Sequence, residues 1–182
     1  MAGSLVLVDE FTISSAVASV TLGGGSSGSS GLNASIDSTY NVYQVVINNV
    51  QSVDDNVGVY IRVTTSGTAD SDSEYDFAKK VIRADSSFGN ESNTNQDKTI
   101  LGSIGTATGE TTNGIFYCHN FNNASEFSFA TFEMSYRNAS GALKGDAGGF
   151  VHTVAEANDG VNFFMQSGNI ASGTFTLYGL KK

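Results

Sequence analysis

Hydrophobic side chains recur at every second position in several short stretches, and this alternation limits the folds available to the chain. The clearest stretch is Val57–Thr64. Its β-branched residues share one face: Val57, Val59, Ile61 and Val63. A period of two places successive side chains on opposite faces of an extended backbone, and β-branched residues favour that conformation. The stretch is therefore a predicted half-buried β-strand.

Similar short stretches follow one another along most of the 182 residues. They are Leu5–Ile13, Ala16–Leu22, Tyr40–Asn48, Lys98–Leu101, Gly114–His119, Phe127–Tyr136, Gly149–Thr153, Val161–Gln166 and Gly173–Leu180. Clusters of Gly, Ser, Asn and Asp separate them, and these residues form turns. With 12 Phe to fill an interior, this spacing predicts an all-β fold, a single antiparallel β-sandwich of jelly-roll type. We expect one domain over residues 1–182.

Several segments are ambiguous in the sequence. Glu74–Ala84 also fits a helical stripe, but we predict an irregular strand there, and Ala155–Asp159 could form one helical turn. In Phe127–Tyr136 the alternation is imperfect, which predicts either a bulge or burial on both faces. The glycine- and serine-rich run Gly23–Gly31 and the polar run Ser86–Gln96 are predicted to be exposed loops.

The charge of the chain excludes several functions. Charged residues make up only 15% and the net charge is −9, whereas nucleic acids and anionic membranes are bound by dense Lys and Arg. One cysteine excludes an intrachain disulfide and a cysteine-based zinc site. Neither a secretory leader nor a spanning apolar run is visible. We therefore expect synthesis in the cytoplasm, with no nucleic-acid or membrane partner.

Few residues carry the pattern of a catalytic or cofactor site. A metal site formed by His119 and His152 would need both on facing strands with a carboxylate such as Glu133, and we interpret both as ordinary strand residues. Cys118 and His119 are neighbours in a strand, so they point to opposite faces and cannot form a catalytic pair. Cys118 is better explained as a small buried hydrophobic residue. We predict no catalytic residues and no cofactor.

The alternating acids Asp70, Asp72 and Glu74 are a weak candidate for calcium, because loop carboxylates are its usual ligands. An EF-hand needs glycine at the sixth position of such a loop, and Tyr75 occupies it here. A solvated acidic turn is the simpler interpretation.

Two segments resemble a known family. They are Ser38–Val50, in which Tyr40 and Tyr43 precede an apolar strand, and Val161–Leu180, which contains Ser-Gly-Asn-Ile-Ala-Ser-Gly-Thr-Phe-Thr-Leu-Tyr-Gly. Both look like small virion structural proteins, of the decoration or tail-fibre-like kind, from tailed and especially marine bacteriophages. The last segment reads as two strands, around Phe163 and Phe175, that close a sandwich.

The resemblance implies a non-enzymatic structural protein of the virion, attached to the capsid or tail as a decoration subunit. Its expected partners are major capsid or tail proteins and further copies of itself, as a homo-oligomer, most simply a trimer, with apolar side chains at the seam. Such a protein needs no secretion signal to reach the particle.

Two other functions are consistent with the fold. A tail-fibre-type module could bind host-surface glycans, for which Tyr40, Asn41, Tyr43 and Tyr60 are the candidates, because tyrosine rings cover sugar faces and amides bond hydroxyls. A polysaccharide-degrading enzyme has the least support, since it needs two carboxylates at a set separation that a sequence cannot identify.

Overall fold

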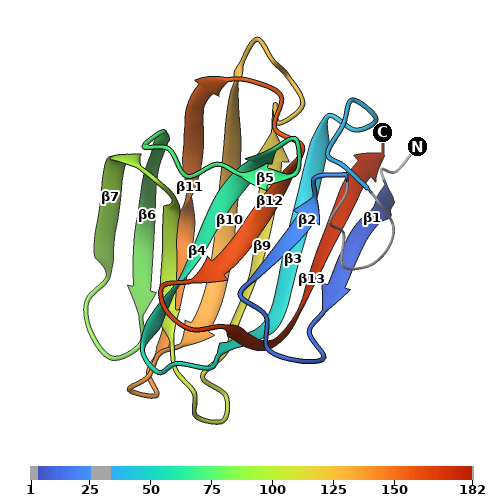
Figure 1. Cartoon of the computed structure of the whole chain (residues 1–182). Helices are drawn as coiled ribbons and strands as arrows, with labels where there is room; N and C mark the ends of the chain where they lie inside the picture. Colours follow the sequence, from blue (N-terminus) through green and yellow to red (C-terminus); the bar gives the residue numbers. More distant parts are fainter. Residues whose placement is uncertain (1–3, 26–33, 182) are drawn as a thin grey trace.

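Two antiparallel sheets lie face to face in the computed structural model, which describes residues 4–25 and 34–181 (Figure 1). The larger sheet has eight strands, in the spatial order β1 (Ser4–Thr12), β13 (Ile170–Lys181), β3 (Val42–Ser52), β9 (Thr112–His119), β10 (Phe127–Arg137), β11 (Leu143–Ala155), β6 (Tyr75–Arg83) and β7 (Gly89–Gln96). The smaller sheet has five, β2 (Ser19–Gly23), β12 (Gly160–Met165), β4 (Val57–Thr65), β5 (Thr68–Ala69) and β8 (Thr99–Ile104), with β8 paired to β4.

The predicted all-β sandwich is confirmed, while its jelly-roll connectivity stays a prediction. The buried apolar side chains of both sheets form one cluster between the layers. At its centre the Phe163 ring lies 5.5 Å from Phe116 and 5.3 Å from Phe175, measured between ring centroids. Phe163 belongs to the smaller sheet and the other two to the larger. The closing segment therefore does supply one strand to each layer, β12 and β13.

Two ambiguous segments are strands. In β6, Tyr75, Phe77, Lys79 and Val81 are buried in strict alternation, so the segment is a strand and not a helix. Its pairing with β7 shifts register between Tyr75 and Phe77, as expected of an irregular strand. In β10 every second residue from Ser128 to Tyr136 is buried, and the register against β11 shifts between Phe127 and Ser128. The bulge is therefore the correct alternative of the two.

Two sequence predictions are wrong, and a third is wrong for the part of it that the structure describes. Most of Ser86–Gln96 is not a loop, because Gly89–Gln96 pairs with β6 as an edge strand whose side chains are polar and mostly exposed. The described residues contain no helix, so Ala155–Asp159 forms no helical turn: Ala155 ends β11, and residues 156–159 form an irregular link. Its Asp159 carbonyl accepts hydrogen bonds from the N–H groups of Gly24 and Ile36.

The third error concerns the glycine run. Gly23 ends β2, and both Gly23 and Gly24 are buried with φ near +75°, a conformation that glycine adopts without strain. The rest of the run, residues 26–31, lies outside the described residues. Within the described residues no helix could cross a bilayer.

Candidate functional site

Large apolar side chains gather on the outer face of the eight-stranded sheet. They are Leu5, Leu7, Ile115, Tyr117, Phe127, Phe129 and Leu180, each 40–50% exposed, and we call them the outer patch. Their strand neighbours Phe116, Cys118 and Ala130 point the other way and are buried in the core. The patch extends from β1 to β10, because Leu7 pairs with Tyr178, Tyr178 with Gln44, Gln44 with Tyr117 and Tyr117 with Thr131.

Small residues beside the outer patch hollow the same face. Across β11 and β6, Thr131 is followed in register by Gly149 and then Ala78. A depression of about 700 Å³ lies there, lined by Phe129, Ala78, Gly149 and Val151 among others. A second depression of about 420 Å³ lies between Ile115, Tyr117, Glu133 and Ala147. The face therefore has recesses as well as apolar side chains, and the Glu133 carboxylate lines the smaller recess.

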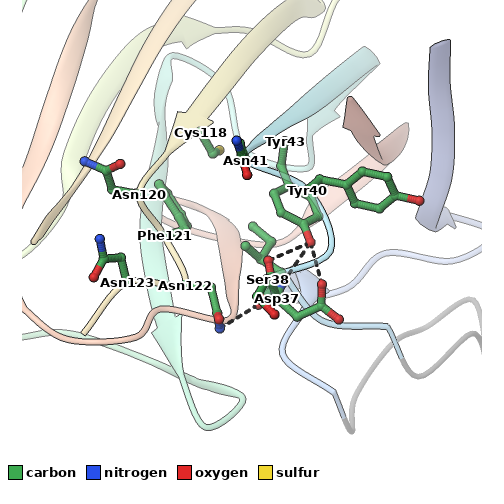
Figure 2. A pocket seen from close by; sticks show the side chains of 11 residues that line it. Asp37, Ser38, Tyr40, Asn41, Tyr43, Cys118, Asn120, Phe121, Asn122 and Asn123 are labelled. Carbon is green, nitrogen blue, oxygen red and sulfur yellow. Dashed lines mark hydrogen bonds between the residues drawn. The ribbon is translucent and has the colours of Figure 1, made fainter. Parts of the chain in front are cut away.

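A separate pocket lies at one end of the sandwich and includes three of the four predicted glycan residues, Tyr40, Asn41 and Tyr43 (Figure 2). Its volume is about 390 Å³. The loop after β9 adds Asn120, Asn122 and Asn123. Carboxamide groups therefore gather around the pocket, as hydroxyl-rich ligands require.

The two tyrosines of this pocket support its wall. The Tyr43 hydroxyl donates to Asp37 and accepts from the Asp37 N–H, at 2.9–3.0 Å. Burial is the largest of the effects that raise the pKa of Tyr43 to about 12. The Tyr40 ring packs against Gly179, where any Cβ would clash with it, and its hydroxyl points away from the asparagines in Figure 2. Tyr60 lies in β4 of the other sheet, against Phe164, so the four residues do not form one site.

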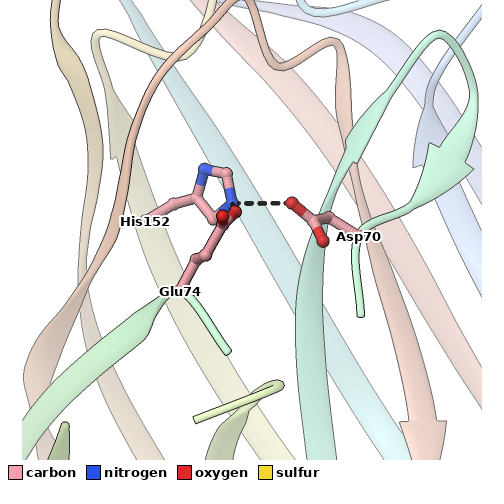
Figure 3. Close-up of side chains that lie close together, drawn as sticks. All are labelled: Asp70, Glu74 and His152. Carbon is pink, nitrogen blue, oxygen red and sulfur yellow. Dashed lines mark hydrogen bonds and ion pairs between the residues drawn. The ribbon is translucent and has the colours of Figure 1, made fainter. Parts of the chain in front are cut away.

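The acidic loop that contains Asp70 and Glu74 lies beside His152, a contact that the sequence pattern does not predict. The His152 Nε2 lies 2.8 Å from Asp70 Oδ2 and 3.4 Å from Glu74 Oε2 (Figure 3). Asp72, by contrast, is exposed and contacts the cluster residues through its backbone: its N–H donates to Asp70 Oδ1, and its carbonyl accepts from the Glu74 N–H. Burial, followed by the charge of Asp70, raises the pKa of Glu74. The calcium candidate is therefore rearranged, with His152 in place of Asp72.

The two histidines lie on opposite faces of the larger sheet. His119 pairs with the outward-facing Phe129, whereas His152 pairs with the inward-facing Ser128. The two histidines therefore do not form a metal site with Glu133. For His119 this agrees with its interpretation as an ordinary strand residue. Cys118 is buried, as predicted, and its burial raises the pKa of the thiol to about 12. A thiol with that pKa is a poor nucleophile.

Neither the outer patch nor the histidine cluster is among the sites expected from the sequence. The alternation of β9 and β10 does contain a signal for the patch. Ile115, Tyr117, Phe127 and Phe129 lie at the outward-facing positions, where polar residues are expected. The cluster has no local signal, because 78 to 82 residues separate His152 from its partners. No protein-family model matches the chain, and no curated protein sequence matches it significantly.

Proposed function

We propose that this protein is a non-enzymatic structural subunit of a bacteriophage particle, which assembles through the outer patch of its larger sheet. The phage assignment rests on the resemblance of the closing segment Val161–Leu180. The mode of assembly rests on a different observation, the exposure of seven large apolar side chains on one sheet face.

Such a face is unusual for an isolated soluble protein. Large contiguous apolar patches mark surfaces that another molecule covers. Aromatic anchors such as Phe129 and Tyr117 contribute the most to protein interfaces. The hollows beside them offer recesses for side chains of a partner. We propose that further copies of the chain cover this face, as a homo-oligomer and most simply a trimer, and that a capsid or tail protein binds elsewhere on the subunit.

Replacing Phe129 by aspartate is expected to weaken self-association at least tenfold, since a charge would be desolvated at the seam. Phe129 is 45% exposed, so the fold should persist. The measurement is molar mass by light scattering over a range of concentrations, with circular dichroism as a check of folding.

Phe88→Asp is the matched control. Phe88 is 59% exposed, but it lies between β6 and β7 and outside the outer patch. This variant should associate as the unmodified protein does. A monomeric unmodified protein, or equal losses in the two variants, would contradict assembly through the outer patch. Binding of the unmodified protein to phage particles tests the virion role separately.

A second candidate function is glycan recognition at the pocket of Asn41 and the asparagine loop. What supports it is the gathering of carboxamides around a recess of about 390 Å³. Asn41→Ala should reduce any signal on a glycan array at least fivefold, because each lost hydrogen bond to a sugar contributes about 1 kcal/mol. Asn90→Ala, an exposed change on β7, should have no effect. An array without hits for the unmodified protein refutes this candidate.

A further inference from the structure

We propose that Asp70, Glu74 and His152 bind a divalent transition-metal ion, with zinc as the best-fitting example. The three residues come from the link after β5, the residue before β6, and β11. Their ligand atoms all lie within 4.8 Å of one another. The chain thus brings an imidazole nitrogen and two carboxylate oxygens to one point between the two sheets (Figure 3).

The charges around this point are unbalanced. The side chain of His152 is fully buried and faces three carboxylates, those of Asp70, Glu74 and Glu156. Among residues 4–25 and 34–181, neither Lys nor Arg forms an ion pair with any of the three. Carboxylates held close together without a cation destabilise one another. A bound divalent ion would remove that repulsion.

The two ring nitrogens of His152 face different environments. Nε2 points at Asp70 and Glu74, whereas Nδ1 is buried with no hydrogen-bond partner, 3.9 Å from Glu156 Oε1. Metal-binding histidines usually direct their second nitrogen, as N–H, towards a carboxylate, which fixes the tautomer. Glu156 is the carboxylate nearest Nδ1 and is itself held by hydrogen bonds from Thr65 and Asn158. A closer approach, from 3.9 Å to hydrogen-bond distance, would let Nδ1–H donate to Glu156 and would leave Nε2 as a ligand.

The donor set favours zinc over calcium, and one of its separations already fits zinc. Calcium takes oxygen ligands and six to eight of them, whereas imidazole with carboxylates suits zinc and its neighbours. Ligands about 2.1 Å from a tetrahedral zinc lie about 3.4 Å apart. The distance from Nε2 to Glu74 Oε2 is 3.4 Å. The 2.8 Å contact from Nε2 to Asp70 is a hydrogen bond that would lengthen as metal replaces the proton, and water would complete the coordination.

The test is thermal denaturation and calorimetry of the full chain, free of any histidine tag, with zinc chloride and calcium chloride in parallel. Zinc at about 100 times its Kd should raise the Tm by about 5–10 °C, and calcium should not. Cobalt, used as a spectroscopic substitute, should give the intense visible absorption of four-coordinate Co²⁺, and added zinc should abolish it.

Glu74→Gln and Asp70→Asn preserve side-chain size and should each weaken zinc binding at least tenfold. Asp72→Asn removes the same charge from the same loop outside the cluster, so it should bind zinc as tightly as the unmodified protein. Circular dichroism without metal shows whether each variant is folded. The proposal is overturned if the unmodified protein binds no zinc, if calcium binds as tightly, or if Asp72→Asn matches the other two. In each case the cluster is a hydrogen-bonded histidine among acids, without a metal.

Discussion

Replacing Phe163 by alanine is expected to lower the free energy of unfolding by about 3–5 kcal/mol. Phe163 is completely buried, and its ring contacts Phe116 and Phe175 of the opposite sheet. The substitution removes apolar burial and leaves a cavity where the two layers meet. Since whole domains are stable by about 5–15 kcal/mol, this is a large share. Urea denaturation followed by circular dichroism measures it.

The adjacent residue provides the control. Phe164 points outward from β12 and is partly exposed; its ring packs against Tyr60, and the Arg62 guanidinium lies over it. Phe164→Ala should therefore lower the free energy of unfolding by only about 1–2 kcal/mol. Equal losses at the two positions would show that Phe163 does not connect the layers as described.

Replacing Lys79 by methionine is also expected to destabilise the protein by about 3–5 kcal/mol. The Lys79 Nζ lies 2.7 Å from Asp146 Oδ2, and their side chains are 2% and 0% exposed. Without the ammonium group, the buried Asp146 keeps only the hydrogen bond from the Tyr136 hydroxyl. Burial, followed by the Asp146 charge, raises the pKa of Tyr136, so this hydroxyl remains a donor. One neutral hydrogen bond does not offset the desolvation of a carboxylate.

The double variant Lys79→Met, Asp146→Leu separates charge from packing. Removing both charges should restore most of the lost stability, because a buried ion pair contributes little over apolar side chains of similar size. The measurement is the free energy of unfolding of both single variants and the double variant. If the double variant is as unstable as Lys79→Met alone, an unpaired carboxylate is not the cause.

Most of the fold could be predicted from alternation alone, and the exceptions have physical reasons. The edge strand β7 reads Gly-Asn-Glu-Ser-Asn-Thr-Asn-Gln; backbone hydrogen bonds to β6 hold it, so it has no apolar face to detect. In β11 the prediction began at Gly149, because the preceding Gly145 and Gly148 carry no side chain to alternate. Strand pairing across such residues depends on close backbone approach, which a sequence does not display.

The candidate sites were less predictable than the fold. Tyr40 and Asn41 do line a pocket, but the partners that give it chemical character follow β9, some eighty residues further along the chain. Asp70 and Glu74 were identified with the wrong third ligand, because proximity in sequence favoured Asp72. Lys79 is one of the alternate residues of β6 that face the core, yet only the fold shows its ion-pair partner: Asp146 lies diagonally from it on β11, opposite Val81.

The pairing of β1 with β13 has a mechanical consequence. Ser4 lies opposite Lys181, and Thr12 lies opposite Thr174, so residues 4 and 181 share one end of this ladder (Figure 1). A force that pulls these two residues apart loads the hydrogen bonds one after another, and the strands peel open as a zipper does. The sandwich should therefore yield at low tension along its backbone, and any tether meant to carry load is better fixed to the broad side of the sheet.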